Sequence, residues 1–296
     1  MPELGARTIT VPPGPDWIIG AGGLVWVAGI AGGVAVFEPR TGRKAGSISL
    51  EGDLCGAPDS GFGSVWFPSC GPAGIHRVSV ASRRLEATIP LALLPGGEFA
   101  IGTGVGGVWA IVEGRGGVRS LARIDPTTNR VEDVFRVPAS AVSVRAGHGS
   151  LWVAAPSGDR VFRIDPMTGA IEAASETGRG PRFLVLDDDG VWVLNQGSGS
   201  VTHISPAADD IASVPVDDVE MHGGDIASGA GSIWVRGTTE LVAEVDPMTH
   251  AVVARYGAPS VGSASVAVVD GQLWISSGAE GVLHRVDLTR RPRHAR

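Results

Sequence analysis

The sequence predicts an all-β protein, a seven-bladed β-propeller with four antiparallel strands in each blade. Three observations predict it. Tryptophan recurs seven times at intervals of 40 to 43 residues, a turn signature follows most of these tryptophans, and no segment has the pattern of a long helix. A repeat of about 42 residues that contains several short strands has the length and the strand content of a propeller blade.

The repeated tryptophans mark the second strand of each blade. Each follows a Gly- or Asp-rich turn inside a short apolar run, as in GGLVWVAG, GHGSLWVA and DDDGVWVL, which predicts strand, turn and strand. A large ring that recurs in the middle of a strand fits packing between blades better than ligand stacking, so we assign these residues to the core. They are Trp26, Trp66, Trp109, Trp152, Trp192, Trp234 and Trp274.

A second run of residues predicts the third and fourth strands. Segments such as LARIDPTTN, VFRIDPMTG and LVAEVDPMTH end in a tight reversal, and an alternating run follows each of them. The aspartates of these turns, Asp125, Asp165 and Asp246, are expected to accept backbone hydrogen bonds within their own turn. The acidic run from Asp187 to Asp189 lacks the spaced ligands of a calcium loop, so we interpret it as a solvated turn.

The last repeat lacks a fourth strand, because the chain ends in the polar tail 289–296. The segment ARTITVP near the N-terminus resembles the outer strands of other repeats. Residues 6–12 are therefore expected to complete blade seven, which closes the ring and removes two exposed sheet edges. On this interpretation residues 1–296 form a single propeller domain.

Composition excludes several classes of protein. A chain that is 43% hydrophobic and 19% charged is not disordered, and no run of about 18 apolar residues could span a membrane. A net charge of -7 with scattered basic residues argues against a nucleic-acid or anionic-membrane partner. The first residues lack the features of a secretory signal, so we expect a cytoplasmic monomer that takes a small-molecule ligand.

Known catalytic motifs are absent. Gly102, Gly104 and Gly107 match G-x-G-x-x-G but lead into a strand, whereas a dinucleotide site needs the N-terminus of a helix. No H-E-x-x-H, G-x-S-x-G, P-loop or C-x-x-C motif occurs. Histidines in the third strands, such as His76, His203 and His284, are expected at the surface.

Blade geometry predicts where chemistry would lie. The inner strand should start, and the second strand should end, at one end of the central funnel, where most repeats carry Gly, Ala, Ser or Val. The polar or reactive exceptions are Asp16, Cys55, Cys70, Glu98, Glu113, Arg182, Asn195, Gln196, His222, Asp225 and Arg236. We take this set as the candidate site; the alternative is a set of local ion pairs and loop hydrogen bonds at a wet rim.

The G-x-V-W-V and R-I-D-P-x-T-G segments resemble the YVTN-type and streptogramin B lyase (virginiamycin B lyase) group of bacterial propellers over nearly the whole chain. The resemblance implies a propeller, and the lyases place catalytic histidines and glutamates in the last two blades and work with magnesium. Here His222 is one position out of register, and Arg236 and Gly237 stand where the family has an acid. Blade seven has Ser263 and Ala264 where the family has the histidine, and Gly278 where the family has the acid. Streptogramin cleavage by the same residues therefore does not follow.

We favour a small-molecule enzyme of lyase or cyclase type with its site in the funnel. Glu98 or Glu113 would be the general base or a ligand of a divalent metal such as magnesium, and His222 would shuttle a proton. Arg182 and Arg236 would hold an anionic group of the substrate. Asp16, Asn195, Gln196 and Asp225 would contribute binding contacts. The alternative is a propeller that binds a ligand or a protein on the same face without catalysis.

The two cysteines are expected to be neighbours. Cys55 lies eleven residues before Trp66 and Cys70 lies four after it, so the antiparallel inner pair of blade two should bring their Cα atoms within about 7 Å. In the cytosol we expect thiols, whereas an exported relative would hold a disulfide.

Overall fold

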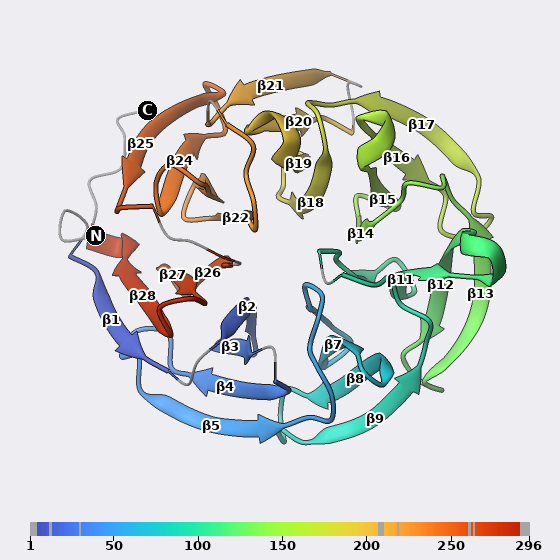
Figure 1. The fold of residues 1–296 in the computed structure, drawn as a ribbon, viewed down its shortest axis with the longest axis horizontal. Helices are drawn as coiled ribbons and strands as arrows, with labels where there is room; N and C mark the ends of the chain where they lie inside the picture. The colour runs from blue at the N-terminus through green and yellow to red at the C-terminus, as the bar shows by residue number, and fades with distance from the viewer. Residues whose placement is uncertain are drawn as a thin grey trace.

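The computed structural model describes residues 5–11, 14–29, 31–96, 98–206, 210–217, 219–259, 262 and 264–290. In this part of the chain, 28 strands form seven four-stranded antiparallel sheets. Figure 1 shows these sheets arranged as the blades of a ring around one axis. The predicted all-β, seven-bladed propeller is confirmed.

Each blade begins at the axis with an inner strand and continues into a second strand that carries the repeat tryptophan. The inner strands are β2 (Pro15–Ala21), β6 (Asp59–Gly61), β10 (Gly102–Gly104), β14 (Ser143–Gly147), β18 (Pro181–Leu186), β22 (Asp225–Gly229) and β26 (Val266–Val269). The second strands are β3 (Leu24–Gly29), β7 (Ser64–Cys70), β11 (Gly107–Glu113), β15 (Ser150–Ala155), β19 (Val191–Asn195), β23 (Ser232–Arg236) and β27 (Gln272–Ser277).

The third and fourth strands complete each blade toward the outside of the ring. The third strands are β4 (Gly33–Phe37), β8 (Ala73–Ser79), β12 (Arg119–Asp125), β16 (Arg160–Ile164), β20 (Ser200–Ile204), β24 (Val242–Asp246) and β28 (Val282–Asp287). The outer strands are β5 (Lys44–Ser49), β9 (Leu85–Pro90), β13 (Arg130–Arg136), β17 (Ile171–Glu176), β21 (Ile211–Pro215), β25 (Ala251–Tyr256) and β1 (Arg7–Thr10). Four short 3₁₀ turns, η2 (Arg115–Gly117), η3 (Pro156–Gly158), η4 (Gln196–Ser198) and η5 (Leu288–Arg290), are the described helical segments, and none has the length or apolar character needed to cross a bilayer.

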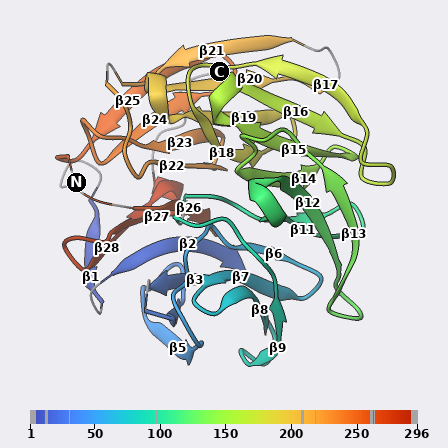
Figure 2. The same cartoon turned by 45° about the vertical axis from the view of Figure 1, so that its right-hand side comes forward.

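The ring closes by pairing the two ends of the chain. β1 lies antiparallel to β28, in a register that runs from Arg7 opposite Arg285 to Thr10 opposite Val282. Figures 1 and 2 show the two strands side by side from both directions. Pro12, which the sequence analysis included in this strand, and residues 291–296 of the tail lie outside the described residues.

The repeat tryptophans are the largest buried side chains of the protein. In five blades the indole N–H donates to the backbone oxygen five residues earlier, as from Trp152 to Gly147 at 3.2 Å. In blade five the Oδ2 atom of Asp187 takes that place at 3.0 Å from Trp192 Nε1. In these six blades the ring thus fills the gap between blades while its one polar atom stays hydrogen-bonded, whereas the indole nitrogen of Trp274 in blade seven is buried without a hydrogen-bond partner among the described residues.

The turns also follow the sequence pattern. The Oδ1 atom of Asp165 accepts hydrogen bonds from the N–H groups of Met167 and Thr168, and Asp125 and Asp246 do the same in their own turns. The prediction of a surface histidine was wrong for His76. Its ring is buried, with Nδ1 3.0 Å from Thr88 Oγ1 on β9 and Nε2 2.8 Å from the Glu51 backbone oxygen, so both ring nitrogens have partners within the protein.

Candidate functional site

The ring has two different faces. The funnel face carries the starts of the inner strands and the loops between the second and third strands of each blade. The turn face, at the other end of the axis, carries the tight turns between inner and second strands and between third and outer strands. All the residues that the sequence analysis selected lie at strand ends or loops of the funnel face.

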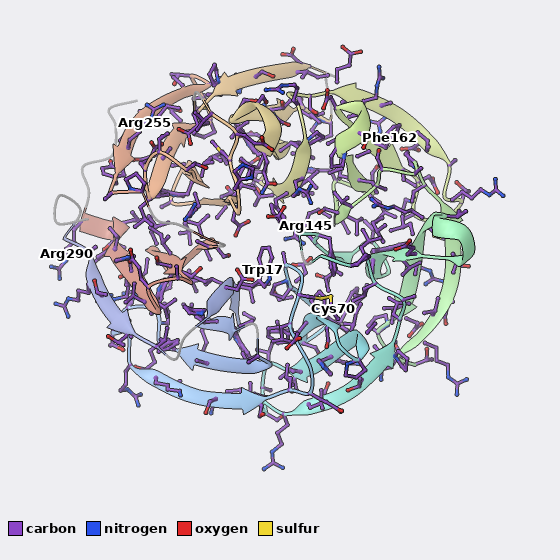
Figure 3. The ribbon with its side chains drawn as sticks, viewed as in Figure 1. Trp17, Cys70, Arg145, Phe162, Arg255 and Arg290 are labelled. Carbon is purple, nitrogen blue, oxygen red and sulfur yellow. A yellow bond between two sulfur atoms is a disulfide. The ribbon has the colours of Figure 1, made fainter. Side chains whose placement is uncertain are left out.

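Two aromatic residues meet across the axis near the funnel face. Trp17 on β2 of blade one and Phe183 on β18 of blade five have ring centroids 5.4 Å apart, and they are only 4% and 2% exposed. Blades one and five are not neighbours in the ring, yet this contact joins their side chains in one continuous apolar cluster. Trp17 lies close to the axis in Figure 3. The two rings therefore close the central channel and form a floor beneath the funnel face.

The same two strands carry β-bulges at this level. The register of β2 with β3 shifts between Pro15 and Trp17, and that of β18 with β19 shifts between Pro181 and Phe183. The extra residue in each strand is polar: Asp16 in β2 and Arg182 in β18. A bulge re-aims the side chains around it, which is why these two strands send an aromatic ring toward the axis.

Arg182 makes an interaction that spans the funnel face. Its Nη1 atom donates to the backbone oxygen of Glu98 at 2.8 Å and lies 3.4 Å from the Oε2 atom of the same residue. Glu98 precedes the inner strand of blade three, so the contact passes over blade four. The side chains of Arg182 and Glu98 are 27% and 42% exposed, so both remain accessible to a ligand.

A hydrogen-bond network joins blades six, seven and one around the axis. The Oδ2 atom of Asp225 accepts from Ser265 Oγ at 2.5 Å and from the Val266 N–H at 3.2 Å. Ser265 Oγ in turn accepts from the Ile18 N–H at 3.1 Å. The Oγ atom of Ser276 donates to the Asp16 backbone oxygen at 2.8 Å. Burial raises the pKa of the Asp225 carboxyl, and these hydrogen bonds act in the opposite direction.

On the other side of the axis, Arg145 ties three blades together. Its Nε atom donates to the Leu184 oxygen at 3.2 Å in blade five, and its Nη1 atom donates to the Ile101 oxygen in blade three. Figure 3 shows Arg145 beside the axis. The attraction of this guanidinium partly offsets the effect of burial on the pKa of Asp225.

The remaining selected residues have different surroundings. Glu113 is exposed at the end of β11, and His222, 80% exposed, lies 4.0 Å from Glu220. Among the described residues, no contact joins Glu98, Glu113 and His222, and no group of three His, Cys, Asp or Glu side chains could hold a metal ion. Magnesium prefers several carboxylate oxygens and waters around one point, so the described residues do not fit it.

Three further selected residues are buried in local contacts. The Nδ2 atom of Asn195 donates to Thr202 Oγ1 at 2.8 Å, and Gln196 Nε2 donates to the Gly224 oxygen at 3.3 Å. The guanidinium of Arg236 donates to the backbone oxygen of Gly237 at 2.5 Å, and burial lowers its pKa. These bonds hold the loops of blades five and six in place.

The two cysteines form a disulfide, with their Cα atoms 5.7 Å apart, which agrees with the expected distance. Of the two states that the sequence left open, thiols or a disulfide, the structure holds the disulfide, in which both sulfur atoms are bonded. The disulfide lies where the inner strand of blade two is irregular, since β6 covers only Asp59–Gly61. It fastens the segment before β6 to the end of β7.

Sequence reasoning missed three residues and one pair. Trp17 is the one tryptophan of eight that stands outside the repeat, and this could have drawn attention to it. Phe183 and Arg145 gave no such signal in the sequence, because they lie in ordinary strand patterns. The buried carboxylates of Asp217 and Glu240 both lie within hydrogen-bonding distance of the Thr239 hydroxyl, and burial raises the pKa of Glu240.

Comparisons with known proteins extend to the fold alone. Neither a protein-family model nor a curated protein matches the sequence. Among solved structures, 1638 chains match, which makes the fold a common one. One is the crystal structure of the computationally designed Ika8 protein, with a TM-score of 0.68 and 10% identity over 94% of this chain and 97% of that chain. Function has to be argued from the site.

Proposed function

We propose that this propeller binds a small anionic molecule on its funnel face, with Arg182 as the anchor. The observation that carries the proposal is the position of this guanidinium. It projects from a bulge above a closed aromatic floor and is oriented by the backbone oxygen of Glu98. Guanidinium groups recognise carboxylates and phosphates through two parallel N–H donors, and one N–H of Arg182 is used for its own positioning.

A bound anion could take the place of the Glu98 carboxylate beside Arg182. The Glu98 carboxylate lies 3.4 Å from Nη1, farther than the 2.8 Å contact to the backbone oxygen of the same residue. An incoming anion can therefore replace the carboxylate while the backbone contact keeps the guanidinium in place. Exposed ion pairs contribute only about 0 to 1 kcal/mol, so this exchange costs little.

The closed floor supports a ligand that stays in the funnel. Trp17 and Phe183 block the axis, so a molecule cannot pass through the ring at that level. Concave sites that combine an apolar base with a few polar groups are typical for small molecules, whereas protein partners favour larger and flatter areas.

A lyase or cyclase step is the second candidate. The observation in its favour is Glu98, a partly exposed carboxylate fixed next to the proposed anion anchor, where a general base would contact a bound substrate. Glu113 and His222 have no contact with it among the described residues, so Glu98 would act without them.

One pair of variants separates the two candidates. A panel of small carboxylates and phosphate esters is screened by thermal shift, and binding is then measured by calorimetry and turnover by mass spectrometry. Arg182→Gln should weaken binding at least about tenfold, and the exposed neighbour Arg179→Gln should not. Glu98→Gln removes the competing charge and should tighten binding.

The outcomes are distinct. If Glu98→Gln binds more tightly and the wild type leaves the ligand unchanged, the protein is a binder. If the wild type converts the ligand and Glu98→Gln binds without converting it, the lyase or cyclase candidate holds. Equal binding by wild type and Arg182→Gln would contradict the proposal itself.

A further inference from the structure

A groove of about 540 Å³ lies on the turn face, at the opposite end of the axis from the proposed site. It runs between blades one and two. One wall is the turn between β4 and β5, with Glu38 and Arg43, together with Ala45 at the start of β5. The other wall is the turn between β8 and β9, with Ala81 and Arg83. Its volume falls in the range of small-molecule sites.

The base of the groove is apolar and tightly built. Leu24 and Val80 line it, and both are half-buried. Gly22, at a φ of +57°, approaches blade two so closely that a Cβ atom there would lie 2.3 Å from Val80 Cγ1. Only glycine allows this approach, so the inner end of the groove is sealed by contact between the two blades.

The two arginines beside the groove, Arg43 and Arg83, differ in whether a carboxylate neutralises their charge. Arg43 donates to the Glu38 carboxylate through both Nε and Nη2, and this pairing lowers the pKa of Glu38. Arg83 instead donates to a neutral group, the backbone oxygen of Ala45, at 2.8 Å. Within the described residues, no carboxylate forms an ion pair with Arg83. One guanidinium is therefore neutralised, whereas the other is held over the groove with its charge uncompensated.

We infer that this groove is a second binding site, independent of the funnel, for a small monocarboxylic acid with an apolar body. The carboxylate would take the N–H donors of Arg83 that face away from Ala45, because a guanidinium carries five donors and one is used here. The apolar body would lie on Leu24 and Val80. The Glu38–Arg43 pair on the facing wall would exclude a second negative charge, since Glu38 is ionised.

The test uses three probes that divide the ligand into its parts. Benzoate has both the charge and the apolar body, benzamide has the shape without the charge, and formate has the charge without the body. Calorimetry with the full chain should show that benzoate binds and that benzamide and formate bind at least about tenfold more weakly.

Two variants locate the site. Arg83→Gln removes the charge from an exposed turn and should weaken benzoate binding at least about tenfold with an unchanged melting temperature. Arg84→Gln, an exposed neighbour that does not line the groove, is the matched control and should bind as the wild type does. Arg182→Gln separates this site from the funnel, because benzoate binding that remains in Arg182→Gln and is lost in Arg83→Gln belongs to the groove.

Three results would overturn the inference. They are no binding of benzoate to the wild type at about 10 mM, equal affinities for benzoate and benzamide, and full affinity in Arg83→Gln. Loss of benzoate binding in Arg182→Gln alone would assign the ligand to the funnel and likewise remove the second site.

Discussion

At the scale of single residues, burial decides what each repeat tryptophan contributes. Trp152 is buried between blades and its indole N–H is hydrogen-bonded, so its removal leaves a cavity that two rigid sheets cannot fill. Trp152→Ala should lower the free energy of unfolding by about 3 to 5 kcal/mol. Urea denaturation measures it, with exposed Met167→Ala as the control; a loss under about 1 kcal/mol would contradict the packing role.

A half-buried histidine gives the protein a predictable response to acid. The ring of His203 stacks on Trp192 with centroids 4.4 Å apart and lies 5.2 Å from the ring of His250. Burial, with a smaller effect of His250, lowers the pKa of His203, while Asp187 and Asp189 act in the opposite direction. The folded state thus binds fewer protons than the unfolded state below about pH 6.5.

Stability should therefore be lost as the pH falls from about 6.5 toward the lowered pKa, with a slope of at most about 1.4 kcal/mol per pH unit for one proton. His203→Gln should flatten this part of the profile when unfolding is measured between pH 7.5 and 5. The exposed His222→Gln is the control. A wild-type slope that survives in His203→Gln would assign the acid sensitivity elsewhere, and half-buried His284, whose pKa is also lowered by burial, would be the next residue to test.

At the scale of elements, the repeat pattern predicts strands well and predicts their irregularities poorly. Alternation and turn residues are local signals, so the second and third strands were foreseeable from runs such as GHGSLWVA and VFRIDPMTG. The bulges at Asp16 and Arg182 each add one residue to a strand, and the amino-acid composition of the strand gives no signal of it. Their effect on the site, two aromatic rings that meet across the axis, is a contact between distant segments, which no local pattern specifies.

The disulfide of blade two takes the place of strand pairing that the short inner strand β6 does not provide. Ladder bonds of β6 extend only over Asp59–Gly61, and the preceding segment is held by Cys55 and by bonds such as that from the Cys70 N–H to the Asp53 oxygen at 2.9 Å. The bridge closes a loop with a sequence separation of 15. Constraint of such a loop in the unfolded chain contributes about 3 kcal/mol.

The double variant Cys55→Ser with Cys70→Ser should therefore unfold about 2 to 4 kcal/mol more easily than the oxidised protein. Denaturation of the wild type with and without a thiol reductant gives the same comparison without mutation, and the reductant should have no effect on the double variant. An unchanged midpoint on reduction would mean that the backbone bonds of residues 51–58 suffice.

At the scale of the whole molecule, the sequence predicted that the ring of blades closes, but not that two aromatic side chains meet across its central channel. Closure followed from counting, because seven tryptophans needed 28 strands and the last repeat was one strand short. The arrangement around the axis depends on which side chains face each other across seven blades. Glu98 and Arg182 were selected separately as exceptions to the repeat, and only the assembled ring brings them together.

The strongest test of the whole ring is removal of its closing strand. Truncation of residues 1–13 deletes β1, exposes the free edge of β28 along the register Arg7–Thr10, and removes Ile9 and Val11 from the apolar cluster of blades one and seven. Two half-buried side chains of this size account for about 1.5 to 3 kcal/mol, so the melting temperature should fall sharply. A synthetic peptide of residues 1–13 added in trans should restore it, because an open sheet edge accepts a matching strand through backbone hydrogen bonds. A peptide of the same composition in scrambled order has the wrong alternation and should not rescue. If the truncated chain melted with the full-length protein, β1 would contribute nothing to stability, and other contacts between blades one and seven, such as those of β2 with β26 and β27 and of Phe37 with Trp274, would suffice to close the ring.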